Sequence, residues 1–364
     1  MIPRSLVLTA SALLIATSSA CAQQGGAPAA DHVARHSASF PADSLVSFIR
    51  AREAETGATI GFHLRHVQSG RTVGHNAADP FFMSSVTKFP ISLTVLRQVE
   101  RGRVRLDDTV TIAASQLSPG RSPLRQAHPN GARLAVRDLI PFAVSQSDNT
   151  ASDALLRLAG GPDSVTAELR RLGLAGIRVS RPYTQLGREL GGRWPAGDDR
   201  DTMTPETATA LLAALQQGRA LAAPQRALLL GWMTRTQNPA SRIVAGVPAG
   251  TVVAHKTGTW WGDDQPGPLA LNDIGIVSLP NGEGHLAIAV FVRNAAVADT
   301  AVERAVAAIT REAWRLWTAR RASTAAFAND GIPATFARLE RVGGSRVGES
   351  RGDERRRGRG SDRG

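Results

Sequence analysis

Two adjacent serines and a lysine stand close together in the stretch FFMSSVTKFP, residues 81–90. Ser85 and Lys88 are three residues apart, and at the start of a helix this spacing places both side chains on one face. A serine hydroxyl beside a lysine amine with a lowered pKa can act as a covalent nucleophile. Ser84 is then expected to cap the helix. The pattern S-x-x-K is common by chance, so it indicates nucleophilic catalysis only with support from elsewhere in the chain.

Two further motifs supply that support. SQSDNTASDALL places Ser147–Asn149 at the entrance to a predicted helix, where such residues usually serve as caps. HKTGT places Lys256–Thr259 on a predicted strand, where a glycine lets a ligand approach the backbone. Lysine and arginine together number 43, yet only two are lysines, Lys88 and Lys256. Since arginine cannot lose its proton near neutral pH and a buried lysine can, both positions are predicted to require an amine.

In the order S-x-x-K, S-D-N and K-T-G, the three motifs form the signature of the penicillin-interacting serine enzymes. From about residue 41 to residue 320 the chain resembles the class A serine β-lactamases. AGVPAGTVVAHKTGT and NDIGIVSLPNG look like the inner strands of that family, and DDRDTMTP (198–205) looks like the end of its omega loop. The resemblance implies an α+β fold of the β-lactamase/transpeptidase type. An antiparallel sheet flanked by helices would lie beside an inserted all-helical lobe, with the site in the cleft between them.

The resemblance also implies a role for each motif residue. Ser85 would be the acylated nucleophile, Lys88 would help to take its proton, and Ser147 would pass a proton to the leaving β-lactam nitrogen. Backbone N–H groups of Ser85 and Thr259 would form the oxyanion hole. Leu117 replaces an aromatic residue that usually lines the cleft. The residues expected to bind substrate are Asn149 (side-chain amide), Lys256, Thr257 and Arg242 (carboxylate), and Gly258 and Thr259.

The chain departs from the family pattern in the omega loop, where a glutamate normally activates the water that releases the acylated serine. The best match to this region is RVSRPYTQLG, residues 178–187. Arg181 aligns with the arginine that pairs with an aspartate, here Asp201. The glutamate position then carries Tyr183, the only tyrosine of the chain, and the asparagine position carries Gly187. Both side chains that would hold the water are absent from the matched positions.

Three hypotheses follow for the release of the acylated serine. Tyr183 could position or activate the water, although a phenol of pKa about 10 is a poor base near pH 7. Glu189 could supply the carboxylate through a rearranged loop. If nothing replaces the glutamate, the acyl-enzyme would be long-lived. The sequence therefore predicts a serine β-lactamase with atypical deacylation through Ser85. The alternative is a penicillin-binding or sensor protein that turns over little.

The two ends of the chain differ in composition from its centre. Arg4 precedes an apolar run and a stretch of small residues, which indicates a signal peptide over 1–22. Cleavage after Ala22 would release a soluble periplasmic protein, whereas cleavage before Cys21 would leave a cysteine for a lipid anchor. The expected organisation is a signal peptide (1–22), a linker (23–40), a catalytic domain (41–320) with an α/β lobe (41–84 and 237–320) and a helical lobe (85–236), and a basic, disordered tail (321–364).

The charge and the histidines argue against several other functions. The formal net charge is +12, and residues 331–364 hold nine arginines against five acids, so 9 − 5 = 4 of the excess lies in the tail. No basic stripe is interleaved with aromatic residues, so nucleic-acid binding is not expected. The eight histidines show no ligand spacing, and neither a metal nor another cofactor is expected. A β-lactam is the expected partner, and the protein is expected to be a monomer.

Overall fold

A computed structural model describes residues 41–190, 198–237, 241–262 and 266–329 of the chain. The predicted signal peptide (1–22), the predicted linker (23–40) and residues 330–364 of the predicted tail lie outside the described residues. Within the described ranges, no helix is long and apolar enough to cross a membrane. In the same ranges, no group of three or more His, Cys, Asp or Glu side chains could hold a metal ion.

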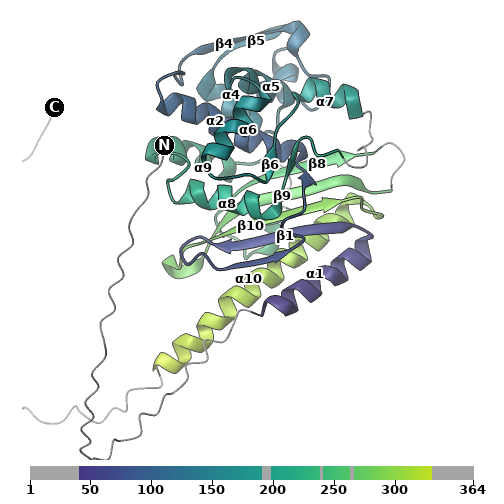
Figure 1. Ribbon diagram of the computed structural model, residues 1–364, viewed down its shortest axis with the longest axis vertical. Helices are drawn as coiled ribbons and strands as arrows, with labels where there is room; N and C mark the ends of the chain where they lie inside the picture. The colour runs from purple at the N-terminus through teal and green to yellow at the C-terminus, as the bar shows by residue number, and fades with distance from the viewer. Residues whose placement is uncertain (1–40, 191–197, 238–240, 263–265, 330–364) are drawn as a thin grey trace, which may run out of the picture. The chain divides into compact units, whose positions relative to one another are not determined.

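Strands from both ends of the described chain form one five-stranded antiparallel sheet, as the sequence predicts. The spatial order is β2-β1-β10-β9-β8, so the first and last strands of the sequence lie side by side (Figure 1). These strands are β1 (Thr59–His66), β2 (Thr72–His75), β8 (Val253–Trp261), β9 (Pro268–Ser278) and β10 (His285–Arg293).

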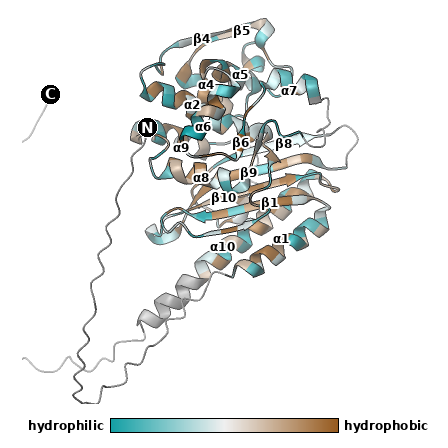
Figure 2. Cartoon of the chain, viewed as in Figure 1, coloured by the Kyte–Doolittle hydropathy of each residue, from teal (hydrophilic) through white to brown (hydrophobic). Residues whose placement is uncertain are grey.

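Two helices cover one face of the sheet. They are α1 (Ala42–Thr56) and α10 (Asp299–Asn329), which pack against each other. Alternate side chains of β1 point into this layer, where Ile60, Phe62 and Leu64 are buried with the apolar face of α10. The central strands are covered on both faces and read as hydrophobic stretches in Figure 2. Helix α10 continues to Asn329, past the boundary expected at residue 320.

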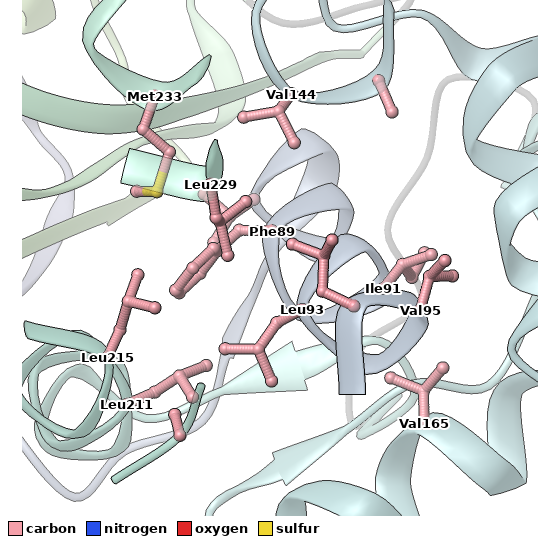
Figure 3. Close-up of a cluster of buried hydrophobic side chains, with 14 of the residues drawn as sticks. Phe89, Ile91, Leu93, Val95, Val144, Val165, Leu211, Leu215, Leu229 and Met233 are labelled. Carbon is pink, nitrogen blue, oxygen red and sulfur yellow. The ribbon is translucent and has the colours of Figure 1, made fainter. Parts of the chain in front are cut away.

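The other face of the sheet meets the inserted helices. They are α2 (Lys88–Glu100), α3 (Pro123–Ala127), α4 (Val136–Val144), α5 (Asn149–Leu158), α6 (Pro162–Arg171), α7 (Tyr183–Leu190), α8 (Pro205–Gln216) and α9 (Ala223–Thr234). The first nine residues of α2, 88–96, are all buried, and Phe89, Ile91 and Leu93 lie in one cluster with α8 and α9 (Figure 3). The nucleophile motif therefore leads into a helix whose first turns are buried in this cluster.

The insertion is not wholly helical, which corrects the expectation of an all-helical lobe. It contains the two-stranded ribbon of β4 (Thr109–Ala113) and β5 (Gly131–Ala135). A second small sheet has the order β3-β7-β6, formed by β3 (Phe81–Phe82), β6 (Ile177–Arg178) and β7 (Thr202–Met203). Strands this short bury too few residues to show an alternating pattern in the sequence. The second sheet brings both ends of the segment 179–201 beside the strand that leads into the nucleophile.

One buried ion-pair network joins α6 to α2. The Glu168 carboxylate accepts hydrogen bonds from Arg97 of α2, from Arg101 directly after α2, and from Arg171 of its own helix. Burial alone would raise the pKa of Glu168, but the hydrogen bonds from Arg101 and Arg97 outweigh it and lower the pKa to about 2. The ionised carboxylate is thus strongly favoured in the folded state.

We expect Glu168→Gln to lower the free energy of unfolding at pH 7 by roughly 2 kcal/mol, because it weakens charge-assisted hydrogen bonds in a buried place. The folded pKa lies below the unfolded value, so this contribution is complete above about pH 4.5 and is lost as the pH falls toward 2. Urea unfolding at pH 7 and pH 3 measures it. Glu55→Gln, which breaks an exposed pair with Arg52, is the matched control. An equal loss in both variants would contradict the prediction.

Candidate active site

The nucleophile motif forms a short 3₁₀ helix, η1 (Ser84–Thr87), that runs directly into α2. Ser84 has φ +48°, a conformation that is costly for a residue with a side chain. Its hydroxyl donates to Thr259 O at 2.7 Å and caps no helix, so the expectation that Ser84 is a cap is wrong. The reason is a tertiary contact, because the carbonyl of Thr259 on strand β8 accepts from this hydroxyl. Pro90 lies in the first turn of α2, where a missing N–H costs little.

Lys88 lies at the centre of a network of hydrogen bonds. Its Nζ atom is 2.9 Å from Ser85 Oγ, 2.9 Å from Ser147 O, 3.2 Å from Ser147 Oγ and 2.7 Å from Asn149 Oδ1. The side chain is fully buried. Burial, and then the nearby charge of Lys256, hold the pKa of Lys88 well below its usual value. The structure thus brings the S-x-x-K and S-D-N motifs together around one amine with a depressed pKa.

The partners of Lys88 determine where its lone pair points. Ser147 O and Asn149 Oδ1 are carbonyl oxygens that can only accept, so they take the two N–H groups of a neutral amine. The lone pair is then left for a hydroxyl, and Ser85 Oγ is the nearer of the two at 2.9 Å. This arrangement lets a neutral Lys88 accept the Ser85 proton.

Ser147 lies between the two lysines of the chain. Its Oγ is 3.2 Å from Lys88 Nζ and 3.1 Å from Lys256 Nζ, and its backbone has φ +59°. The strain is held by Asp148, whose carboxylate accepts from the N–H groups of Ala151 and Leu124. Asp148 is therefore the cap of α5, as the sequence indicates for this triplet. Within the motif, Asp148 caps the helix, and its neighbour Ser147 contacts the two lysines of the site.

Strand β8 passes unusually close to the nucleophile at Gly258. A Cβ atom there would lie 2.5 Å from Met83 O and 3.1 Å from Ser85 N, so only glycine fits. The hydrogen bond from Ser84 Oγ to Thr259 O fastens the two segments at the same place. Ser85 and Thr259 thus both line one cleft, and an oxyanion hole formed by their N–H groups stays a prediction.

A cleft of about 850 Å³ opens over Ser85. Arg242 lines it and donates to Thr259 Oγ1 at 2.7 Å and to Gly258 O at 3.2 Å, while Glu303 accepts from its guanidinium. The other predicted site residues that line the cleft are Ser85, Ser147, Asn149, Tyr183, Thr257, Gly258 and Thr259.

Lys256 does not line the cleft. It is fully buried, and its Nζ donates to Thr257 O as well as contacting Ser147 Oγ. Burial lowers the pKa of Lys256 to about 7, against the opposing charge of Asp273. Lys256 contacts the Ser147 hydroxyl from behind the cleft wall. The contact of Lys256 with a substrate carboxylate therefore stays a prediction. Leu117 likewise packs against the helical core rather than lining the cleft.

The Tyr183 side chain lies against the nucleophile segment. Its hydroxyl donates to Ser84 O at 3.0 Å, and its ring lies 4.3 Å from Lys88 Nζ. The phenol packs with Phe82, Leu186 and Trp260 in a small apolar cluster. Burial raises the pKa of Tyr183 above its usual value of 10. A phenol that donates its proton and resists ionisation is not suited to act as a base.

The Glu189 carboxylate is hydrogen-bonded to residues that do not line the cleft. Its carboxylate accepts from Arg181 at 3.0 Å, from Arg200 at 3.3 Å and from Gln185 at 2.6 Å. The hydrogen bonds from Gln185 and then Arg181 lower the pKa of Glu189. Arg181 also pairs with Asp201 at 2.7 Å, the pair that the sequence comparison predicts. Glu189 thus joins Arg181 to Arg200 and lies outside the cleft lining.

Sequence reasoning missed Asp153, a buried carboxylate on α5. It accepts from the N–H groups of Tyr183 and Thr184, at 2.6 and 3.0 Å, and so holds the first turn of α7. Burial raises its pKa, and its charge raises that of Lys88. Its spacing of four residues from Asn149, on the same face of a predicted helix, was the available signal.

Comparison with known proteins places this site in a family. The model of the β-lactamase enzyme family matches residues 44–317. β-Lactamase AST-1 of Nocardia asteroides is 37% identical over 218 residues, 59% of this chain and 68% of the relative. The carbapenem-hydrolysing β-lactamase KPC of Klebsiella oxytoca is 31% identical over 280 residues, 75% of this chain and 90% of the relative.

Solved structures agree with the sequence comparisons. A β-lactamase structure from Chitinophaga pinensis superposes with a TM-score of 0.71 at 31% identity, over 76% of this chain and all of that one. A structure of the extended-spectrum β-lactamase TLA-3 gives 0.71 at 29% identity, over 76% and 99%. The protein therefore belongs to the β-lactamase enzyme family, and within it to the class A serine β-lactamases. The α+β fold predicted from the sequence is confirmed.

Proposed function

We propose that this protein hydrolyses β-lactams through an acyl-enzyme on Ser85, and that the proton transfers of both half-reactions pass through Lys88. The observation that carries the proposal is the position of Lys88 Nζ, fully buried and 2.9 Å from Ser85 Oγ. The relatives named above are β-lactamases, which supports this substrate class. The signal-like N-terminus supports export to the periplasm as part of the same proposal.

In acylation, Ser85 Oγ bonds to the β-lactam carbonyl carbon while its proton passes to the lone pair of Lys88. The developing oxyanion accepts from the N–H groups of Ser85 and Thr259. The C–N bond then breaks, and the nitrogen takes a proton from the Ser147 hydroxyl, which Lys88 replaces. Ser147 Oγ is 3.2 Å from Lys88 Nζ, within reach of this relay. Lys88 ends the half-reaction neutral.

Deacylation requires a base near the ester, and this is where the proposal departs from the family pattern. Within the described lining of the cleft, the carboxylates are Asp299 and Glu303, and Glu303 accepts from Arg242. We assign the base to the neutral Lys88. Water would add to the ester carbon as its proton passes to Lys88, and the Oγ–C bond would break as that proton returns to Ser85. Tyr183 would position Ser84 and Lys88 through its hydroxyl and ring.

A specific observation favours a second function, a binder that keeps its acyl group. The apolar cluster of Phe82, Tyr183, Leu186 and Ala270, with Trp260 against it, lies at the omega-loop side of the nucleophile. Apolar side chains there leave fewer polar groups to order a water molecule. If water cannot reach the ester, the protein would be a penicillin-binding or sensor protein.

Intact-protein mass spectrometry after mixing with benzylpenicillin separates these functions. We expect an adduct of one penicillin that maps to Ser85, decays over time and releases penicilloate. An adduct that persists without product would support the binder. The absence of any adduct on Ser85 would overturn both. Ser85→Ala is the matched control, because it removes only the nucleophilic hydroxyl and should form no adduct.

Tyr183→Phe tests the role of the phenol. The variant loses the hydrogen bond to Ser84 O, so we expect a loss of about 1 kcal/mol in stability and a change of less than about tenfold in the deacylation rate. A stopped-flow measurement of adduct decay against pH reads the rate. A decrease of 10² or more, together with loss of the basic limb of the pH profile, would show that the phenol takes part in proton transfer.

A further inference from the structure

A second cavity, of about 440 Å³, lies where α8 crosses the sheet, and it shares no lining residue with the catalytic cleft. Its wall is made of the turn between β1 and β2, the segment after α6, and the last turns of α8. The volume is within the range of small-molecule pockets, about 300–1,000 Å³.

Two arginines, Arg65 and Arg219, line this cavity, and no acidic residue lines it. In the described part of the chain, no carboxylate lies within 4.0 Å of either guanidinium. The Nε atom of Arg65 is buried and makes no hydrogen bond. A buried guanidinium N–H without an acceptor is costly. The cavity thus holds positive charge that nothing in its wall neutralises.

The strand and the helix explain why Arg65 faces the cavity. Alternate residues of β1 face α8, which lies over β1 (Figure 1). A Cβ at Gly61 would lie 2.8 Å from Pro205, the first residue of α8, and His63 is hydrogen-bonded to Thr209 one turn later. Arg65 is the next residue on that face. Burial and then the charge of Arg65 lower the pKa of His63 to about 4, so His63 adds no second charge.

Small and apolar side chains opposite Arg65 leave the space open. Helix α8 presents Ala210, Ala213 and Ala214 to the cavity, and the segment after α6 adds Leu172 and Leu174. These side chains form an apolar wall beside the charged one. At the rim, Gln217 accepts from Arg219 at 2.7 and 3.0 Å and donates to Val67 O at 2.8 Å, which orients Arg219.

We infer that this cavity is a binding site for a small organic anion, whose carboxylate or phosphate pairs with Arg65 and Arg219 and whose short apolar body lies against α8. Arginine is suited to planar, two-point recognition of both anions. A ligand here would contact the turn of the sheet and helix α8 together, so its binding would stabilise the native state.

Isothermal titration and thermal unfolding with defined probes test this site. The probes are hexanoate, hexyl phosphate, inorganic phosphate and hexylammonium. We expect one equivalent of hexanoate or hexyl phosphate to bind and raise the melting temperature, with competition between the two. Whichever binds more tightly identifies the source as a carboxylate or a phosphate ester. Hexylammonium is expected not to bind, because its charge repels both arginines.

Substitutions in the cavity lining show whether the anion binds at this place. Arg65→Gln and Arg219→Gln should each weaken binding by about tenfold or more, and Arg133→Gln, an exposed arginine on β5, should not. Ala210→Leu should fill the cavity and block binding with both arginines present. Amide chemical shifts of Gly70 and Gly173 should move, and those of Thr257 to Thr259 in the cleft should not.

Three results would overturn the inference. They are binding that is unchanged in Arg65→Gln, equal binding of hexylammonium, and shifts confined to the catalytic cleft. If inorganic phosphate binds as tightly as hexyl phosphate, the inference that α8 binds an apolar part of the ligand is wrong. The melting temperature without ligand shows that each variant is folded, so a loss of binding cannot be mistaken for a loss of structure.

Discussion

Replacing Lys88 by arginine should slow the acylation of Ser85 by roughly 10²–10⁴, the usual contribution of a general base. Arginine keeps the positive charge but does not lose its proton near neutral pH, so it offers no lone pair to the Ser85 hydroxyl. Lysine at this position does, because its buried amine has a pKa well below its usual value. Stopped-flow kinetics of adduct formation with a chromogenic cephalosporin measure the rate.

Lys88→Met completes this test. Methionine has nearly the length of lysine and neither charge nor lone pair, and it packs easily in an apolar place. If the amine is the base, both variants should lose acylation to a similar extent. Acylation that survives in Lys88→Arg and is lost in Lys88→Met would show that only the charge is needed. The unfolding midpoint of each variant separates a chemical effect from misfolding.

The assignment of Lys88 as the base also predicts how the acylation rate depends on pH. The reactive form of Lys88 is the neutral amine, so the acylation rate constant of the natural protein should rise as the pH increases through the lowered pKa of Lys88. In Lys88→Met that rise should disappear. A rate that falls with increasing pH over the same range would mean that the protonated lysine is the active form.

Gly258→Ala should reduce acylation by about 10²–10³, the usual effect of losing an oxyanion-hole donor. The added methyl would lie 2.5 Å from Met83 O and 3.1 Å from Ser85 N, so β8 and the nucleophile segment must separate. That separation moves the N–H of Thr259 away from that of Ser85. The acylation rate is the readout, with the unfolding midpoint measured alongside it.

Gly231→Ala, on α9, is the matched control for this change. Its added methyl would meet the Arg235 side chain at 3.6 Å, an ordinary contact, and alanine favours the helix. Acylation should therefore be unchanged in this variant. If Gly258→Ala acylates as fast as the natural protein, the spacing of the two backbone segments does not set the rate.

The sequence was sufficient for the fold and for the identity of the reacting groups. Alternation of apolar residues predicts β1, short apolar runs bounded by turn residues predict the strands after residue 250, and helical spacing predicts α1, α5 and α8, because each pattern reflects local backbone geometry. The three motifs, with the two lysines of the chain inside them, predict Ser85, Lys88, Ser147 and the K-T-G strand. The structure places Ser85, Ser147 and residues 257–259 in the lining of one cleft, with Lys88 and Lys256 buried behind it and in contact with these serines.

Only the tertiary structure decided what surrounds those groups. Ser84 has an ordinary capping sequence, yet its hydroxyl bonds to Thr259 from a strand 175 residues away. Tyr183 and Glu189 both stay open as candidates in the sequence, because a pattern of residues carries no information on burial or on partners. The fold buries Tyr183 against Ser84 and pairs Glu189 with Arg181 and Arg200. Local sequence determines which groups a segment offers, and long-range packing determines their protonation, their partners and their access to water.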